Sequence, residues 1–463
     1  MTRVDELQKK YPDVPREIII KLDVLVHGVR DTDDLDKVSD WAPAHGTYQS
    51  YRHDMTLKEL IEKRPDQLRP GLFRRPRDMY MKNGIGVQIQ GDVKSDYAVR
   101  EVREGRFALF QGEDKIEDIY FLDPKKNTEP EPTTSKGTPV SKLVNRWQSS
   151  PYCFIIAPVR YCQYFDTGEQ CRFCNYNSTQ EDARSIGLEH AITISLEETV
   201  EAYRIAAANT RFIEGRMEMG GFSKSERETK ILLDFAEKIA SAASYKPNLT
   251  CHGQAESREH MQRLKDAGID CITVQMEVWG RELFEEICPG KAKHARYERW
   301  LEAMLEAVDI FGKGNVGGKI IAGVTLMPDN GHKTWQEARD NHIEGLRWLF
   351  KNGLYTTFTQ LRLGAGSVYG DNRALSEKRL PPTEYCLDVA TAHNEACMET
   401  GMYEKINKLM YCPMDCFTNM YGGDIGILAL AGDIGAWVED CVPSGQNWLA
   451  NFVSSMKTAV KTP

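Results

Sequence analysis

The stretch Arg160–Asn177 reads RYCQYFDTGEQCRFCNYN and holds three cysteines close together. They are Cys162, Cys171 and Cys174, so their spacing is C-x8-C-x2-C. The apolar run CFIIAPVRY comes directly before Cys162 and is typical of a buried strand. Thiols that follow a strand at this spacing indicate a metal or redox site at the carboxyl end of that strand.

A repeated pattern of strand and then helix extends outward from this stretch, over residues 146–365. Six strand-like segments alternate with amphipathic helical segments, which predicts parallel βαβ units with right-handed crossovers. Six such units form either a partial barrel or an open sheet. We expect an α/β fold built on a partial (β/α)6 TIM-like barrel, in which ligands collect at the carboxyl ends of the strands.

The two flanks of this core have a different pattern. Residues 1–145 contain short β-like runs and end in a Pro-, Thr- and Lys-rich connector, so we expect an N-terminal accessory domain of mixed α/β structure with a linker. Residues 366–463 hold a further helix and a cysteine-containing tail, and we expect a C-terminal cap there.

The composition of the chain narrows its function class. The formal net charge of -9 gives no general basic field for nucleic acid, and we find no apolar run of about 20 residues for a membrane span. The N-terminus lacks the apolar core of a signal peptide. We therefore expect a cytoplasmic protein whose twelve cysteines do not need to form disulfides.

The residue pattern alone leaves three uses open for the three thiols. Three thiolates suit a 4Fe–4S cluster with one open iron, whereas a structural zinc site normally requires a fourth ligand. A thioredoxin-like couple uses only the CxxC pair and leaves Cys162 unexplained. A cluster is the favoured interpretation, and zinc and redox thiols remain alternatives.

Three cysteines after the first strand of a βα barrel, with an aromatic residue before the third, resemble the radical S-adenosylmethionine (radical SAM) enzymes. This resemblance implies that Cys162, Cys171 and Cys174 bind a 4Fe–4S cluster whose open iron chelates S-adenosylmethionine. It also implies that Phe173 lies beside the adenine, and that a flavodoxin or ferredoxin supplies the electron for cleavage of a carbon–sulfur bond. The family's usual spacing is C-x3-C-x2-C, so the first gap is longer here.

The same resemblance implies further cofactor contacts at strand ends. Gly220 and Gly221 match the family's glycine-rich turn after the second strand, although Phe222 replaces the usual acid. The resemblance further implies cofactor contacts by residues at the ends of the fourth and fifth strands: Gln275, Glu277, Gly323 and Val324.

Polar residues at the strand ends are candidates for substrate contact or catalysis. Residues two apart on a strand share a face, so Gln275 and Glu277 form one same-face pair and Gln360 and Arg362 another. The candidate catalytic residues are His252, Glu277, Gln360 and Arg362. An alternative is a hydrogen-bond network that only fills the barrel.

The tail holds Cys412, Cys416 and Cys441, with the spacing C-x3-C-x24-C. These cysteines loosely resemble the second cluster of the hydrogenase-maturation tyrosine lyases, in the biotin synthase, thiazole synthase and aromatic amino-acid lyase group. The resemblance implies an auxiliary iron–sulfur cluster. The alternative is three buried thiols in the cap.

These patterns together predict a radical SAM enzyme of the lyase or transferase type, acting on a small molecule. Bond cleavage, rearrangement or insertion of sulfur or carbon would all fit, and a methyltransferase or a non-standard cleavage of S-adenosylmethionine is an alternative. An alternative of another class is a non-catalytic zinc or iron–sulfur protein that binds partners.

Overall fold

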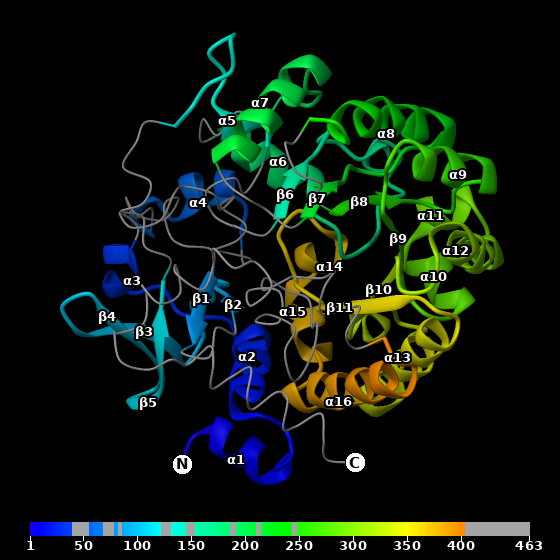
Figure 1. Ribbon diagram of the computed structural model, residues 1–463. Helices are drawn as coiled ribbons and strands as arrows, with labels where there is room; N and C mark the ends of the chain where they lie inside the picture. The colour runs from blue at the N-terminus through cyan, green and yellow to red at the C-terminus, as the bar shows by residue number, and fades with distance from the viewer. Residues whose placement is uncertain are drawn as a thin grey trace.

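The structure is a computed structural model, shown in Figure 1. It describes residues 1–38, 55–67, 78–81, 86–121, 131–144, 153–185, 191–209, 214–242 and 248–402. Cys412, Cys416 and Cys441 lie outside these ranges, so the expected auxiliary cluster stays a prediction.

The core of the molecule is a six-stranded sheet in which every neighbouring pair of strands is parallel. The strands follow one another in sequence order, which confirms the expected parallel α/β fold. Figure 1 shows them along an arc with helices on its outer side. The strands are β6 (Cys153–Ile156), β7 (Glu214–Met217), β8 (Asn248–Gly253), β9 (Cys271–Glu277), β10 (Val316–Ala322) and β11 (Tyr355–Gln360).

Helices connect these strands, and Thr334 illustrates how they begin. Its hydroxyl accepts a hydrogen bond from the Glu337 backbone N–H while the Glu337 carboxylate accepts one from the Thr334 backbone N–H, a capping box that satisfies two free donors. The connecting helices are α6 (Tyr176–Ser185), α7 (Leu196–Asn209), α8 (Ser225–Ile239), α9 (Arg258–Asp266), α10 (Arg281–Ile287), α11 (Pro289–His294), α12 (Tyr297–Phe311) and α13 (Trp335–Lys351). Short 3-10 turns are η3 (Pro65–Gln67), η5 (Gln163–Phe165), η6 (Val324–Leu326) and η7 (Glu377–Arg379).

The two faces of the sheet differ in burial because the outer face packs under the helices. Outward side chains are buried, including those of Met217, Cys251, Val274 and Ile320. Their neighbours on the inner face are only half-buried, and these are Arg216, His252, Gln275 and Lys319. The inner face therefore borders space that the helices do not fill.

Near the carboxyl end of β9, this strand has one residue more than the facing part of its partner β10. Gly318 pairs with Val274 but Ile320 pairs with Glu277, so the register shifts between them. Glu277 has a φ of 72°, the one positive φ of a non-glycine residue in the described ranges. A bulge of this kind re-aims side chains, and such strained backbone is found mostly at functional sites.

The first strand of the sheet is shorter than the sequence pattern predicts. The strand β6 ends at Ile156, so Cys162 does not follow it directly as expected. Pro158 has no backbone N–H for a sheet ladder, which explains the early end. After Pro158 the chain pairs with a later segment instead of with β7: the Arg160 N–H donates to the Ile192 carbonyl oxygen at 2.7 Å.

Residues near the N-terminus form a second, antiparallel sheet with the strand order β2-β1-β5-β4-β3. Its strands are β1 (Asp78–Met81), β2 (Gly86–Gln88), β3 (Tyr97–Arg103), β4 (Arg106–Gln111) and β5 (Asp114–Tyr120). The helices of this part are α1 (Arg3–Lys10), α2 (Arg16–His27), α3 (Asp33–Lys37), α4 (Leu57–Lys63) and α5 (Val140–Leu143).

The C-terminal helices contact this N-terminal part through a buried carboxylate. Asp23 of α2 is fully buried and accepts hydrogen bonds from the Thr383 hydroxyl and the Tyr97 hydroxyl, each at 2.5 Å. The Arg3 guanidinium donates to the same carboxylate at 2.8 Å. The helices after the core are α14 (Val368–Asp371), α15 (Arg373–Ser376) and α16 (Thr383–Glu399). The domain boundaries at residues 145 and 365 stay predictions.

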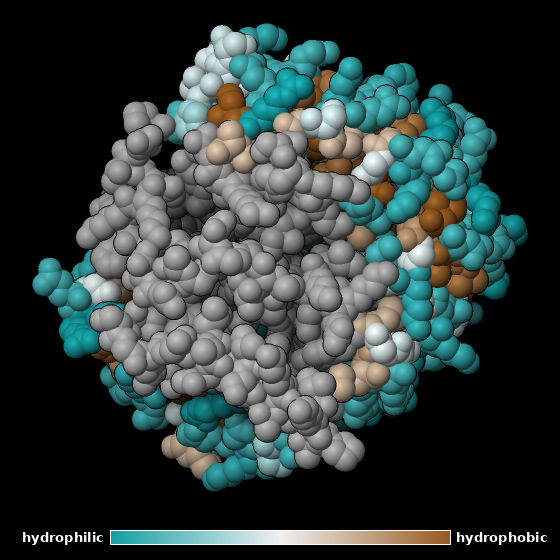
Figure 2. Space-filling view, in the orientation of Figure 1, coloured by the Kyte–Doolittle hydropathy of each residue, from teal (hydrophilic) through white to brown (hydrophobic). Residues whose placement is uncertain are grey.

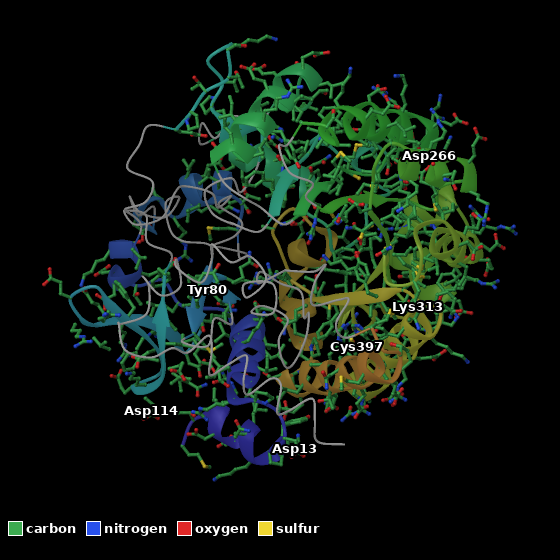
Figure 3. All side chains as sticks on the ribbon, in the orientation of Figure 1. Asp13, Tyr80, Asp114, Asp266, Lys313 and Cys397 are labelled. Atoms are coloured by element: carbon green, nitrogen blue, oxygen red, sulfur yellow. The ribbon has the colours of Figure 1, made fainter. Side chains whose placement is uncertain are left out.

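The outer surface over the helices of the core is mainly hydrophilic, with small hydrophobic patches (Figure 2). The ends of α12 and α16 meet where Lys313 donates to the Thr400 carbonyl oxygen at 3.1 Å, and Figure 3 labels Lys313 and Cys397 in this region. None of the helices in the described ranges has the length and apolar character to cross a membrane.

Candidate active site

A cavity of about 250 Å³ lies at the carboxyl ends of β7, β8 and β9. All three cysteines of the opening motif line it, together with Phe173 and the glycine pair Gly220–Gly221. The remaining lining residues are Tyr164, Tyr176, Glu218, Met219, Glu228, His252, Gly253, Gln254, Gln275, Glu277 and Lys291. The loop after β6 and the ends of three strands thus meet at one cavity.

The first cysteine, Cys162, is held by its own backbone and by a side chain of helix α6. Asn177 accepts the Cys162 N–H at 2.9 Å and donates to the Cys162 carbonyl oxygen at 3.2 Å. The sulfur accepts hydrogen bonds from the backbone N–H groups of Tyr164 and Gly221. Burial outweighs these bonds and raises the pKa of the Cys162 thiol to about 11.

The other two cysteines lie on a turn in which the Cys174 N–H donates to the Cys171 carbonyl oxygen at 2.9 Å. The loop before this turn is attached to the junction of α10 and α11. Arg172 N–H donates to the Ile287 carbonyl oxygen at 2.9 Å, and Gly290 N–H donates to the Glu169 carbonyl oxygen at 2.9 Å. The long first gap of the motif is therefore an ordered connection to another part of the chain.

A fourth thiol, Cys288, lies against Cys171. Its contact with Cys171 lowers the pKa of the Cys171 thiol, whereas burial raises the pKa of Cys288. Cys288 is fully buried and does not line the cavity. It sits at the junction between α10 and α11 and so supports the cysteine loop from behind.

The donor set fits a cluster with several irons. Within the described ranges, no three His, Cys, Asp or Glu side chains are placed to hold a single metal ion. Cys162, Cys171 and Cys174 are free thiols that open on one cavity, and a 4Fe–4S cluster takes each thiolate on a separate iron. Burial raises the pKa values of Cys162 and Cys174, so ligation by these thiols would release protons.

Gly220 and Gly221 let the turn after β7 approach the cysteine loop closely. A Cβ at position 220 would come within 2.6 Å of the Cys162 Cα, and one at position 221 within 2.6 Å of the Tyr164 ring. The Gln163 N–H also donates to the Gly221 carbonyl oxygen at 3.0 Å. Close packing alone therefore explains why these two positions are glycine, beside any contact with a cofactor.

Glu277 forms an ion pair with Lys291 at the rim of the cavity. The Lys291 ammonium lies 3.1 Å from Glu277 Oε1, and the two side chains are only 12% and 9% exposed. The same ammonium donates to the Gln275 carbonyl oxygen at 2.5 Å. Lys291 thus holds the bulged end of β9 by both a side chain and a backbone oxygen.

His252 is neutral in this environment. Burial lowers its pKa to about 3, against the opposing charge of Glu218. The Gln275 amide nitrogen lies 2.7 Å from His252 Nδ1. The Glu218 Oε2 lies 3.4 Å from the same Nδ1, so this ring nitrogen faces both an amide and a carboxylate.

A second polar network also lines the cavity. The Tyr164 hydroxyl donates to Gln254 Oε1 at 2.7 Å, and the Gln254 amide donates to Glu228 Oε2 at 2.5 Å. Burial, followed by the nearby charge of Glu256, raises the pKa of Glu228 to about 8. Glu228 is therefore mainly protonated at neutral pH and adds no full charge to the cavity.

Four of the expected site residues do not reach the cavity. Gln360 points to the outer layer, where its amide nitrogen lies 3.1 Å from the sulfur of Cys386 on α16. Gly323 packs against Pro381, 2.6 Å from the position of an added Cβ, with Val324 buried beside it. Arg362 lies in the segment after β11 and does not line the cavity. None of these four residues is among those that line this cavity, and their assignment as site residues stays a prediction.

Sequence reasoning missed several lining residues, Lys291 above all. Lys291 follows Cys288-Pro-Gly on a short helix, and no strand-end pattern points to it. Glu228 sits in the first turn of α8, where a carboxylate is ordinary. Glu218 lies two residues before Gly220 in MEMGGF, and this closeness to the glycine pair could have indicated that Glu218 lines the site.

No protein-family model matches the sequence. Among curated proteins, the chain is 26% identical over 167 residues to the bacteriochlorophyllide c C-7(1)-hydroxylase of Chlorobaculum limnaeum. The match spans 33% of this chain and 41% of the hydroxylase, so the chain matches less than half the length of that relative.

Several solved structures match the chain at low similarity. Coproporphyrinogen III oxidase from Escherichia coli, described as a radical SAM enzyme, is 10% identical with a TM-score of 0.38, covering 68% of this chain and 67% of the other. A radical SAM methyltransferase from Sphaerobacter thermophilus is 11% identical with a TM-score of 0.32, covering 82% and 92%. The hydrogenase maturase HydG of Carboxydothermus hydrogenoformans is 13% identical with a TM-score of 0.38, covering 67% and 82%.

Proposed function

We propose that this chain, which resembles the radical SAM enzymes in its cysteine motif and its parallel α/β fold, is a radical SAM enzyme acting on a small molecule. The observation that carries the proposal is that Cys162, Cys171 and Cys174 line one cavity together at the carboxyl ends of the strands. We propose these three thiols as the ligands of a 4Fe–4S cluster. When bound, the cluster and S-adenosylmethionine supply the chemistry of reductive carbon–sulfur cleavage.

In this proposal the chain's own residues hold and orient the ligands. The backbone N–H groups of Tyr164 and Gly221 donate to the Cys162 sulfur, which stabilises the thiolate form that ligation requires. The Lys291–Glu277 ion pair keeps the end of β9 in its bulged shape at the cavity rim. Such pre-formed contacts fix the ligands without reorganisation during the reaction.

The cavity walls supply donors and acceptors and limit contact with water. His252 lines the cavity beside Gln275 and Glu218, and the Tyr164–Gln254–Glu228 network forms another part of its wall. The cavity that these walls enclose has a volume of about 250 Å³. We propose an external one-electron donor, such as a flavodoxin or ferredoxin, as the partner.

The type of reaction is a further proposal. The relative with the matching segment is named as a hydroxylase, which adds hydroxylation to lyase and transferase reactions as a candidate for this chain. The earlier alternatives of methyl transfer and of sulfur or carbon insertion use the same cleavage chemistry. They differ in the substrate, which the cavity residues do not identify by themselves.

The test is anaerobic reconstitution of the full chain with iron and sulfide, followed by reduction in the presence of S-adenosylmethionine. We expect a brown 4Fe–4S chromophore and formation of cleaved S-adenosylmethionine products. Cys174→Ala should lose both, whereas Cys251→Ala, a buried thiol on β8 outside the cavity, should retain both. A colourless, zinc-loaded wild-type protein without cleavage would instead support the non-catalytic alternative.

A further inference from the structure

Two thiols from distant parts of the chain meet at the wall of the cavity. Cys171 belongs to the cysteine loop, and Cys288 lies between α10 and α11. A side-chain hydrogen bond joins them, with the Cys288 thiol as donor and the Cys171 sulfur as acceptor. Both residues are free cysteines. The two sulfur atoms are therefore neighbours, which is the first requirement for a disulfide.

The backbone holds these two thiols together on one side. The N–H of Arg172, the residue after Cys171, donates to the carbonyl oxygen of Ile287, the residue before Cys288, at 2.9 Å. The Arg172 carbonyl oxygen in turn accepts the Tyr369 N–H at 3.1 Å. The cysteine loop is thus attached to the segment that carries Cys288 at the position next to both thiols.

A second set of contacts joins the same two segments on the other side of the thiols. The Gly290 N–H donates to the Glu169 carbonyl oxygen at 2.9 Å, and the Lys293 ammonium pairs with the Glu169 carboxylate at 2.6 Å. A Cβ at position 290 would lie 2.6 Å from the Glu169 carbonyl oxygen and 2.6 Å from the Tyr164 ring. The segments are therefore closely packed, and the folded chain itself keeps the two thiols in contact.

The two thiols differ in their access to small molecules. Cys171 lines the cavity and is half-buried, whereas Cys288 is fully buried and does not line it. A small oxidant that enters the cavity can reach Cys171 directly. An accessible thiol with a second thiol beside it is the arrangement in which the second one resolves the oxidised form of the first as a disulfide.

We propose that Cys288 is a resolving thiol, which forms a reversible disulfide with Cys171 when no cluster is bound. Hydrogen peroxide first oxidises the Cys171 thiol to a sulfenic acid and is reduced to one water. The Cys288 sulfur then attacks the Cys171 sulfur, the sulfur–oxygen bond breaks, and the hydroxyl leaves as a second water with the proton of Cys288. Two thiols are thereby oxidised to one disulfide, and one peroxide is reduced to two waters.

The disulfide has two consequences for the site. It removes Cys171 from the set of thiols that can bind iron, and it stops oxidation before the sulfinic acid, which ordinary thiol reductants do not reverse. A thiol reductant restores both cysteines by exchange. The inference rests on the proposed function, because it describes how the same cluster site is protected while it is empty.

Peptide mapping by mass spectrometry tests the proposal on the full chain. The cluster-free protein is reduced, freed of reductant, treated with hydrogen peroxide and alkylated before digestion with trypsin. Trypsin cleaves after Arg172, so Cys171 and Cys174 fall on different peptides. Wild type should show a disulfide between peptides 161–172 and 282–291, and dithiothreitol should remove it.

Three variants identify the sulfur atoms. Cys171→Ser and Cys288→Ser should each lose the linked pair of peptides. Cys162→Ser is the matched control, because it removes the other thiol of peptide 161–172 and should keep the link. Cys288→Ser should instead accumulate sulfinic acid at Cys171, a gain of two oxygen atoms that a merely structural role for Cys288 does not predict. Circular dichroism checks that the variants fold.

A link from Cys171 to the Cys174 peptide in place of the Cys288 peptide would overturn the proposal. So would the absence of any link in wild type, or a link that persists in Cys288→Ser. Iron uptake on reconstitution is measured separately. Peroxide-treated wild type should bind iron only after dithiothreitol, whereas peroxide-treated Cys288→Ser should not recover. Untreated wild type that binds no iron would contradict the proposed function, and the peptide map would still decide the disulfide.

Discussion

The ammonium of Lys291 lies 3.1 Å from the carboxylate of Glu277, and both side chains are almost withdrawn from water. Glu277 also has the positive φ of 72° that ends β9. A charge pair in such a position stabilises an otherwise strained strand end, because breaking it would leave a buried charge without a partner.

Replacing Lys291 by Met should therefore destabilise the protein by about 3–5 kcal/mol, the range for removing one member of a buried ion pair. Urea denaturation measures the free energy of unfolding. Lys293→Met is the matched control on the same helix, since Lys293 is 70% exposed and should cost less than about 1 kcal/mol. The double variant Lys291→Met, Glu277→Gln should recover part of the loss, and no recovery would argue against the ion pair as its cause.

Gly220→Ala should reduce the iron that the protein takes up on reconstitution. The new methyl group would sit within 2.6 Å of the Cys162 Cα, so the cysteine loop has to move. Gly253→Ala is the control in the same cavity, because its added Cβ would meet Ile272 at an ordinary 3.4 Å. Equal iron content in the two variants would mean that the close approach at position 220 does not position Cys162.

The ionised Asp23 should stabilise the folded protein, and this stabilisation should be lost in acid. Burial alone would raise its pKa, but hydrogen bonds from His27, Thr383 and Tyr97 and the charge of Arg3 lower it to about 2, from 3.8 in the unfolded chain. This stabilisation, about 2 kcal/mol, is present above pH 3.8 and is lost as the pH falls toward 2. Comparing unfolding free energies of wild type and Asp23→Asn across this range measures it, and parallel profiles would contradict the assignment.

Glu228 should make the free energy of unfolding depend on pH in the opposite direction, so that stability falls as the pH rises. Its folded pKa of about 8 lies above the ordinary value of 4.5, so the folded protein binds this proton more tightly than the unfolded chain does. The resulting stability is complete below pH 4.5 and is lost as the pH rises through 8. Glu228→Gln mimics the protonated side chain, and its unfolding free energy should fall less steeply over this interval. An unchanged slope in the variant would assign the pH dependence to another group.

The tail cysteines can be tested by iron counting. If Cys412, Cys416 and Cys441 bind an auxiliary 4Fe–4S cluster, reconstituted wild type should hold about eight irons and Cys412→Ala about four. Cys397→Ala, a thiol on α16, serves as the control. An iron content of about four in both wild type and Cys412→Ala would mean that the tail thiols bind no cluster.

Sequence periodicity was sufficient to predict the parallel sheet and to predict that the three cysteines of the motif lie at the carboxyl ends of its strands. It could not decide which face Gln360 occupies, because both faces of a parallel sheet are enclosed and alternation does not distinguish the inner from the outer side. It also misjudged the length of β6, since Pro158 ends the ladder before the apolar run ends. Sequence periodicity could not predict the role of Lys291, because this residue lies on a separate helix, α11, whose fold places its side chain at the end of β9.

The attachment of the cysteine loop to later parts of the chain also sets an order of assembly. Arg172 is hydrogen-bonded to Ile287 on one side and to Tyr369 on the other, through its N–H and its carbonyl oxygen. During synthesis the three thiols of the motif emerge long before either partner exists. The two contacts that attach the cysteine loop to Ile287 and Tyr369 can therefore form only after residue 369 has left the ribosome.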